Sequence, residues 1–391
     1  MQISCISRGA LVWGLFALAP FSVPLNAWCA GAKPVQPAPD EVVLTLPGDS
    51  RSDATLQTLR DAVRRQPDNT DAVANLTRHY LSLAERHVDP RMAGMADALL
   101  DKQPVFTPRL LALKARQQAF SHNFEAALET LDKAVELSPD NIELRLHRAN
   151  YRMLQSDFSG ADRDCRQISD SGDSLLGAFC QSRLTAYLGE PLLAQAVQSR
   201  LAPLLSGNKD MQAWISTVQA ETAWLADDIE SARSHFENAL DQYPGFAYTL
   251  RRLADIALIQ ARYADVLAMI PTDSNVDALI LRATHAALLA GDDKRLNEGR
   301  ERYEQRRKAI IQSLRILHPA DEAYYFTHIS PDADAAIKAA RQNWAQQQSP
   351  EDWQLLAQAS ALSGGTATLP AFPPWITERS PLIVLNTEVK Q

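Results

Sequence analysis

Apolar side chains recur at helical spacing along most of the chain. The clearest segment begins at Asn123, ends at Pro139 and reads NFEAALETLDKAVELSP, with alanine, leucine and valine three or four positions apart. This spacing places the apolar side chains on one face of a helix. Valine, isoleucine and threonine do not cluster in alternating runs, so strands are not expected. The pattern predicts an all-α fold.

The helical pattern itself repeats with a period of 34 residues. This separation relates Ala115 to Ala149, Phe124 to Phe158, Ala127 to Ala161 and Ala220 to Ala254. The clearest units are 108–141, 142–174, 213–246 and 247–271. They resemble the tetratricopeptide repeat, in which a helix A packs against a helix B and small residues stand where the two cross closely. The resemblance implies a right-handed superhelical α-solenoid of about eight antiparallel helix pairs.

The chain also resembles a group of exported bacterial tetratricopeptide repeat proteins. The similarity lies in a signal segment, the Cys165 and Cys180 positions, a late Ala-Arg-Gln-Asn-Trp-Ala run at 340–345 and Ser-Pro-Glu-Asp at 349–352. Membership of that group implies an architecture and no particular activity. The present chain departs from it after Ser363, where a proline-rich tail replaces a further helix.

Four segments are expected along the chain. Residues 1–32 read as a signal peptide, with Arg8 before the apolar run 10–19 and cleavage after Ala27 or Ala32. An uncleaved anchor is the alternative, but the apolar run is short for a bilayer span and prolines interrupt its end. Residues 33–52 form a proline-rich linker, 53–362 the repeat domain and 363–391 a proline-rich extended tail. We therefore expect a periplasmic or secreted protein with no stable membrane span after removal of the signal.

A disulfide is predicted between Cys165 and Cys180. The first cysteine lies near the end of a helix B and the second near the middle of the next helix A, with a short turn between them. At about 1.5 Å rise per residue the two lie at similar heights on antiparallel neighbours. An exported protein meets an oxidising compartment, which permits the bond. The alternative is a pair of small buried apolar side chains.

Neither composition nor motifs indicate an enzyme. The formal net charge is −8, which disfavours nucleic acid as a partner. The eight histidines form no zinc-binding pattern, and phosphate-binding and nucleophile motifs are missing. Asp227-Asp228 and Asp292-Asp293 fall at turns, where acids cap helices. The basic run 300–308 reads as a solvated face held by ion pairs within one helix. No catalytic residue, cofactor or metal is expected.

The predicted binding surface is the concave groove lined by the A helices. Repeat proteins of this kind place binding residues on inward positions of helix A, and arginine, tyrosine and tryptophan are frequent at binding hot spots. Projection of the repeat phase gives Arg109, Arg116, Asn150, Arg183, Tyr187, Trp214, Glu221, Trp224, Tyr248, Arg251, Asp255 and His285. For Trp224 and Tyr187 the alternative is packing between helices as part of the core.

Two functions remain open from the sequence. The first is an exported, non-catalytic scaffold or adaptor that binds a protein or peptide partner in the concave groove. The second is a structural or assembly component of a cell-envelope complex, acting through the convex face or the C-terminal tail. The tail, which contains Trp375 and the apolar run 381–385, is expected to cap the solenoid, with occupation of the groove as the alternative.

Overall fold

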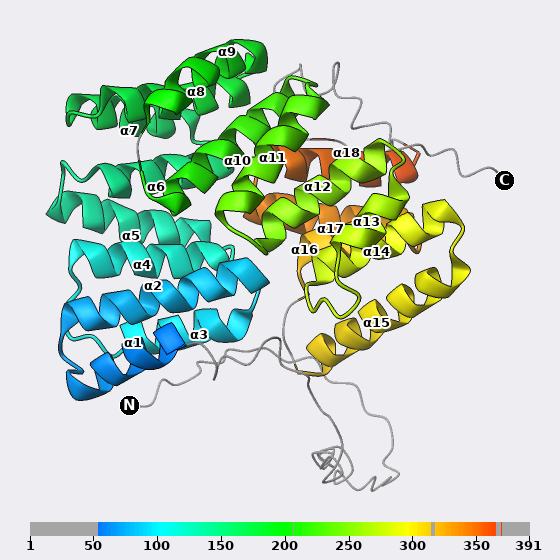
Figure 1. Ribbon diagram of the computed structural model, residues 1–391, viewed down its shortest axis with the longest axis horizontal. Helices are drawn as coiled ribbons and strands as arrows, with labels where there is room; N and C mark the ends of the chain where they lie inside the picture. Colours follow the sequence, from blue (N-terminus) through cyan, green and yellow to red (C-terminus); the bar gives the residue numbers. More distant parts are fainter. Residues whose placement is uncertain (1–53, 206, 314–316, 365–368, 370–391) are drawn as a thin grey trace, which may run out of the picture. The chain divides into compact units, whose positions relative to one another are not determined.

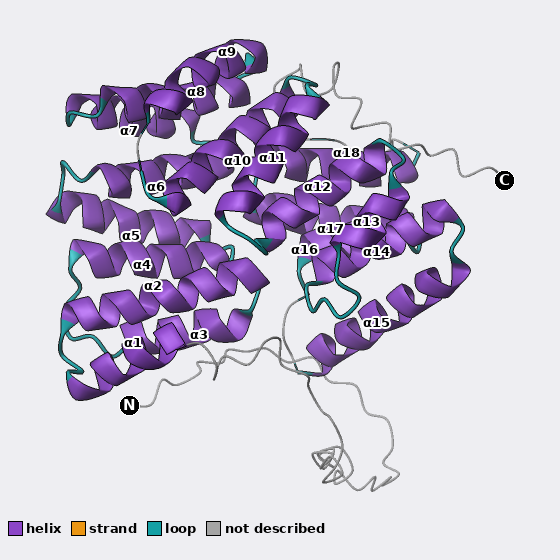
Figure 2. Cartoon of the chain, in the orientation of Figure 1, coloured by secondary structure: helices purple, strands orange, loops and turns teal. Residues whose placement is uncertain are grey.

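The computed structural model describes residues 54–205, 207–313, 317–364 and 369. These residues form eighteen α-helices and one short 3₁₀ helix, with no strand among them (Figure 2). The chain divides into two units, Met1–Gly48 and Asp49–Gln391, and all described residues belong to the second. The predicted signal peptide and linker, and the tail apart from residues 363, 364 and 369, lie outside the described residues.

The helix bounds are as follows. They are α1 (Ala54–Arg65), α2 (Thr70–His87), α3 (Pro90–Leu100), α4 (Pro108–Phe120), α5 (Phe124–Leu137), α6 (Ile142–Leu154), α7 (Phe158–Asp170), α8 (Ser174–Tyr187), α9 (Pro191–Leu201), η1 (Ala202–Leu204), α10 (Lys209–Leu225), α11 (Ile229–Gln242), α12 (Ala247–Ile259), α13 (Tyr263–Met269), α14 (Asp277–Ala290), α15 (Asp293–Gln312), α16 (Pro319–His328), α17 (Ala333–Gln346) and α18 (Pro350–Leu362).

Consecutive helices pack as pairs, and the pairs stack in chain order (Figure 1). The described helices make eight such pairs, from α2 with α3 to α16 with α17, preceded by α1 and followed by α18. The even-numbered helix of each pair corresponds to helix A of the predicted repeat and the odd-numbered helix to helix B. The predicted all-α solenoid of antiparallel helix pairs is confirmed.

The 34-residue period is visible in the backbone as well as in the side chains. His122 and Ser156 both have positive φ, at 56° and 57°, and so do Asp227 and Ala261, at 62° and 54°. Each of these residues lies in the turn that joins helix A to helix B. The left-handed conformation reverses the chain within three residues. The turn is therefore repeated with the same period as the buried alanines.

Acidic and amide side chains begin the B helices at these turns. Asp228 accepts a hydrogen bond from the Ser231 amide at 3.1 Å, and Asp292 accepts one from the Arg295 amide at 3.0 Å. Both are N-caps, as the sequence predicted for the two aspartate pairs. These acids satisfy backbone donors that would otherwise lack partners at the start of α11 and α15.

The small residues of the repeat allow close packing of helices. Ala115, Ala127, Ala149 and Ala161 are all fully buried. Gly177 shows how close α7 and α8 approach, since a Cβ there would lie 2.9 Å from the Cys165 carbonyl oxygen. Such a distance leaves no space for a methyl group without movement of a helix.

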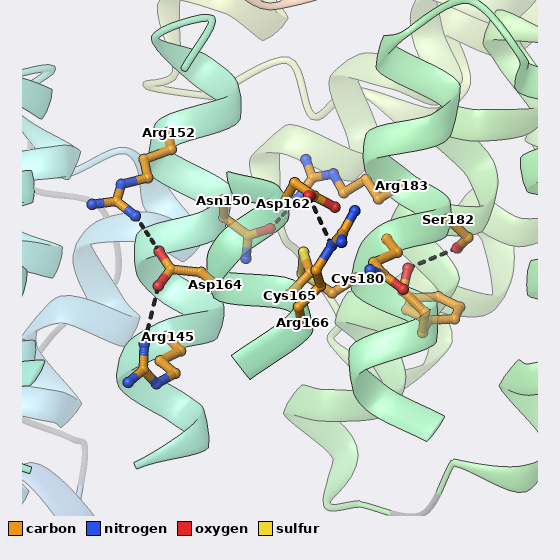
Figure 3. Close-up of a disulfide and its surroundings, with 12 residues drawn as sticks. Arg145, Asn150, Arg152, Asp162, Asp164, Cys165, Arg166, Cys180, Ser182 and Arg183 are labelled. Atoms are coloured by element: carbon orange, nitrogen blue, oxygen red, sulfur yellow. Dashed lines mark hydrogen bonds and ion pairs between the residues drawn. A yellow bond between two sulfur atoms is a disulfide. The ribbon is translucent and has the colours of Figure 1, made fainter. Parts of the chain in front are cut away.

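The predicted disulfide joins α7 to α8 at this close approach (Figure 3). The Cα atoms of Cys165 and Cys180 are 5.4 Å apart, within the usual range for a disulfide. Both residues are buried in one apolar cluster with Ile168 and Leu184. The bond thus lies inside the core, where two successive helix pairs meet.

A buried carboxylate lies beside the disulfide. Asp164 of α7 is 1% exposed and accepts hydrogen bonds from Arg148 at 2.9 and 2.6 Å and from Arg152 at 2.7 Å. Arg145 approaches it at 3.4 Å. Figure 3 shows Asp164 between Arg145 and Arg152. The three arginines lie on the face of α6 that packs against α7, so the aspartate joins the two helices of one pair.

The basic run of α15 differs from its prediction. Within this helix the ion pair of Arg307 with Glu304 is long, at 3.8 Å. Arg307 instead donates to Glu322 of α16 at 2.9 Å, and Arg302 donates to the Thr272 carbonyl before α14. The expected set of ion pairs within one helix is therefore wrong in part. These side chains bind neighbouring helices and a loop, and they hold the long α15 in place.

No helix among the described residues has the length and apolar character needed to span a membrane.

Candidate partner-binding surface

The residues predicted to line the groove lie on successive A helices. We call the surface that they form the A-helix surface. Its members come from α4, α6, α8, α10, α12 and α14, and every one of them is buried or half-buried. The contacts of these side chains fall into three groups along the array.

The first group lies on α4 and binds α2. The Arg109 guanidinium donates to Asp71 at 2.5 Å and to Asn75 at 2.6 Å. Arg116 forms a two-bond pair with Glu85, with Nε to Oε1 at 2.6 Å. Two parallel bonds of this kind fix the position of a guanidinium. Both predicted residues therefore connect neighbouring A helices.

The second group forms a continuous polar row across four A helices. Arg183 of α8 donates to Asn150 of α6 at 2.7 Å and to Glu221 of α10 at 3.0 Å. The Tyr248 hydroxyl of α12 donates to the other oxygen of Glu221 at 2.6 Å. Tyr187 lies under the row, with the Arg183 guanidinium 5.7 Å from its ring centre. The structure brings these five predicted residues together.

Burial raises the pKa values of the two tyrosines at this row. It raises the pKa of the Tyr187 hydroxyl to about 12. The pKa of Tyr248 is raised well above its usual value, first by burial and then by the charge of Glu221. Both hydroxyls consequently stay protonated and can donate hydrogen bonds at any physiological pH.

The third group joins α12 and α14 to the C-terminal helices. Arg251 forms an ion pair with Glu351 of α18, and Arg282 of α14 donates to Asp255 at 2.8 Å. Arg252 lies between them, with its guanidinium 3.9 Å from the centre of the Trp224 ring. The Arg252 guanidinium lies farther from its carboxylates than Arg282 does from Asp255, at 3.6 Å from Asp255 and 3.7 Å from Glu351.

The charge of Glu351 is stabilised by these arginines. Burial acts to raise the pKa of its carboxyl, but the neighbouring Arg251 and Arg252 outweigh burial and hold the pKa below its usual range. The carboxylate is therefore charged at neutral pH and is half-buried beside these arginines. Glu351 belongs to none of the predicted groove positions.

A short segment around Glu351 contacts two of these A helices, α6 and α12. We call residues 346–352 the closing segment. The Gln348 amide donates to the Leu154 carbonyl at the end of α6 at 2.7 Å, and the Gln155 side chain donates to the Gln346 carbonyl at 2.8 Å. Gln347 between them is extended, with φ −145° and ψ 133°. The segment thus binds α6 through its backbone and α12 through Glu351.

Further contacts join the first helices to later ones. The His122 and His318 Nε2 atoms are 3.1 Å apart, between the α4–α5 turn and the start of α16. Arg86 of α2 lies over the Tyr243 ring at the end of α11, at 4.4 Å. These contacts and the closing segment relate parts of the chain that lie far apart in the sequence.

The remaining predicted residues pack within the core. Trp214 contacts Phe179 edge to face, with ring centres 5.6 Å apart. His285 is buried, and its Nδ1 lies 2.8 Å from the Tyr324 hydroxyl. Trp224 packs between helices under Arg252, as the alternative interpretation of this residue expected.

Several residues of the site were missed by the sequence reasoning. Arg252, Arg282, Tyr324 and Glu351 all contribute contacts, yet only Arg252 lies on an A helix of the clear repeats. The Ser-Pro-Glu-Asp run that contains Glu351 is the signal that the sequence offers, because it lies outside the clear repeats and resembles a motif of the exported group. Its contact with α12 was not derivable from the repeat period.

Among the residues that the structure describes, no group of three or more histidine, cysteine, aspartate or glutamate side chains is placed to hold a metal ion.

Comparison with known proteins adds likenesses of fold. No family model matches the chain, and no curated protein matches it in sequence. The Cut9-Hcn1 hetero-tetramer of the APC/C gives 15% identity and a TM-score of 0.40 over 78% of this chain and 52% of that one. The present chain thus spans about half the length of that protein. A tetratricopeptide repeat protein from Parabacteroides merdae gives 12% identity and a TM-score of 0.36, over 78% of this chain and 99% of that one. Yeast Tom70 gives 10% identity and a TM-score of 0.42, over 79% of this chain and 78% of that one.

In fold, the chain is similar to tetratricopeptide repeat proteins. At these low TM-scores the likenesses carry no argument of their own, so the fold assignment rests on the helix pairs and the 34-residue period of the chain itself.

Proposed function

We propose that this chain is a non-catalytic scaffold whose A-helix surface binds a peptide segment of a partner protein. One observation carries the proposal: the surface binds a segment of the chain itself. The closing segment places an extended backbone against Leu154 and a carboxylate against Arg251. A surface that accommodates the short extended stretch after α17 and the acidic first turn of α18 has the chemistry to accommodate a peptide with the same groups.

The partner would exchange with the closing segment. Each contact of the closing segment is one that a peptide could replace: a backbone hydrogen bond to α6, a side-chain bond from Gln155 and the ion pair with Arg251. The cost of releasing Glu351 lowers the apparent affinity for the partner, since only the open fraction of molecules can bind.

A synthetic peptide of residues 345–356 tests the proposal. In fluorescence anisotropy, Glu351→Gln is expected to bind the labelled peptide about fivefold more tightly than the unmodified chain, because internal competition is weakened by about 1 kcal/mol. Arg251→Gln is expected to lose binding, since it removes the group that pairs with the peptide carboxylate. Glu237→Gln on the exposed face of α11 is the matched control and should behave as the unmodified chain.

Two results would contradict the proposal. Equal peptide binding by the Arg251→Gln and Glu351→Gln variants would exclude the A-helix surface as the binding site. Failure of every variant to bind at about 1 mM peptide would exclude peptide binding altogether. Circular dichroism of each variant separates loss of binding from loss of fold.

Export of the chain is part of the proposal. It is supported by the signal-like residues 1–32 and by the Cys165–Cys180 disulfide, which is a feature of oxidising compartments. Amino-terminal sequencing of the mature protein from a periplasmic extract should start at Trp28 or Lys33. A chain recovered only from the cytoplasm with Met1 retained would contradict export.

The second candidate function is assembly of an envelope complex through the outer face of the array. The observation that favours it is the exposed apolar surface of α9 and its flanks. Leu192 and Leu193 of this B helix are 60% and 56% exposed.

A further inference from the structure

Two histidines from distant parts of the chain face each other. His122 lies in the turn between α4 and α5, and His318 is the residue before α16, 196 positions later. Their Nε2 atoms are 3.1 Å apart, and their ring centres are 5.0 Å apart. The side chain of His318 is 43% exposed, so water and ions can reach the pair.

The repeat does not require a histidine at either position. Ser156 lies 34 residues after His122 in the equivalent turn and has nearly the same positive φ. The residues that precede the A helices α4 and α6 are Thr107 and Asn141, and each caps its helix through its side chain. His318 occupies the same place before α16 but makes no such bond. Neither imidazole is needed to form its turn, so the contact between the two requires another explanation.

Each imidazole also contacts a second polar side chain. The Asp321 carboxylate lies 3.2 Å from Nδ1 of His318, and the Gln347 side chain hydrogen-bonds the His122 ring. When a carboxylate accepts the Nδ1 proton of a neutral histidine, Nε2 is left with a bare lone pair. Histidines that bind metal ions nearly always have such a partner, which fixes the tautomer and the orientation of the ring.

The separation of the two Nε2 atoms suits one ion of the zinc type. A tetrahedral ion with Zn–N bonds of about 2.0–2.1 Å holds two nitrogen ligands about 3.3 Å apart, close to the 3.1 Å between His122 and His318. Imidazole is a good ligand for Zn²⁺ and Cu²⁺, whereas Mg²⁺ and Ca²⁺ prefer oxygen. The two ligands lie far apart in the chain, which is why the sequence shows no zinc-binding spacing.

We propose that His122 and His318 bind one Zn²⁺ ion between the α4–α5 turn and the start of α16. Asp321 orients the His318 ring, and water completes the coordination of the ion. The ion binds both histidines only while the two parts of the chain are in contact, so it stabilises that contact. The site uses none of the side chains on which the peptide-binding proposal rests and is independent of it.

Isothermal titration of the EDTA-treated full chain with Zn²⁺ tests the site. His122→Asn and His318→Asn should each weaken this binding at least about a hundredfold, because each removes a ligand. Asp321→Asn keeps both ligands and should weaken binding about tenfold. His235→Gln on α11 is the matched control and should bind as the unmodified chain does.

Two further measurements complete the test. Cys5 and Cys29 are present in every variant, so any zinc bound by their thiols cancels in the comparison, and circular dichroism establishes that each variant is folded. Electron paramagnetic resonance of the Cu²⁺ complex requires no substitution, and it should show coupling to the nitrogens of two imidazole rings.

Three results would overturn the proposal. The first is an unmodified chain that binds no Zn²⁺ up to about 1 mM, in which case the two imidazoles share only a proton. The second is a His122→Asn variant that is folded and binds as many ions as tightly as the unmodified chain. The third is a Cu²⁺ spectrum with coupling to fewer than two imidazole rings.

Discussion

At the scale of single residues, buried and half-buried ion pairs in this chain connect helices. Asp164 accepts hydrogen bonds from two arginines of α6 and is approached by a third, and Glu351 is held between Arg251 and Arg252. Burial of a carboxylate is costly unless such partners surround it. The loss of one partner then leaves an uncompensated charge in the interior. Loss of one partner from an isolated exposed ion pair leaves a charge that water can solvate, so its effect on stability is small.

Asp164→Asn should destabilise the fold strongly. The substitution keeps the shape of the side chain but leaves the α6 arginines without their common carboxylate, and we expect a loss of about 3 kcal/mol in the free energy of unfolding. Urea unfolding followed by circular dichroism measures the change. Asp162→Asn is the control, because its pair with the exposed Arg166 should contribute less than about 1 kcal/mol. Equal effects of the two substitutions would contradict this account.

At the scale of helices, the fold follows closely from the sequence. The 34-residue period predicted the helix pairs because close helix crossings require small residues at fixed positions, and Ala115, Ala149 and their counterparts are buried as expected. The period could not predict where the arginines of α15 point. Their partners are a loop and a helix whose positions depend on the packing of several pairs.

The disulfide between α7 and α8 should contribute measurably to stability. It closes a loop with a sequence separation of 15 residues, for which restriction of the unfolded chain corresponds to about 3 kcal/mol. The double variant Cys165→Ser with Cys180→Ser should lose stability of this order in urea unfolding. Alkylation of the unreduced protein followed by mass spectrometry checks the bond itself, and labelling of both cysteines would show that it is not formed.

At the scale of the whole molecule, contacts between distant helices decide how much of the site could be predicted. The repeat phase placed Asn150, Arg183, Glu221 and Tyr248 on one surface, and they form a continuous row. It could not place Glu351, which lies 100 positions from Arg251 and outside the clear repeats. A periodic pattern describes neighbours in the stack and contains no information on contacts that skip several pairs. Partner binding by the surface stays a prediction.

Acid should destabilise the chain through two half-buried histidines, His122 and His328. Burial, with the charges of His318 and Arg282 respectively, lowers the pKa values of His122 and His328 to about 4. An unfolded histidine titrates near 6.5, so the unfolded state binds more protons between these values. Stability is therefore complete above about pH 6.5 and falls as the pH is lowered toward 4.

His318 has the opposite effect. Burial acts to lower its pKa, but the charge of Asp321 outweighs burial and raises it. The stability that it contributes is complete below its unfolded pKa and is lost as the pH rises through the folded value. The direction in which each histidine changes stability with pH is therefore tested best by substituting one histidine at a time. His328→Gln should reduce the loss of stability between about pH 6.5 and 4 in thermal unfolding. A pH profile that matches that of the unmodified chain would contradict the assignment.

The closing segment has a consequence for how the chain folds. In an open stack of repeats each pair contacts only its neighbours, so folding can start anywhere and partly folded stacks can persist. Here Gln155 binds residue 346 and His122 meets His318, contacts that span 191 and 196 positions. Such contacts form only after the intervening helices are in place. The entropy cost of closing these long loops therefore arises late in folding. The early and late halves of this stack are thereby coupled into one cooperative unit, which an open repeat protein of the same length would lack.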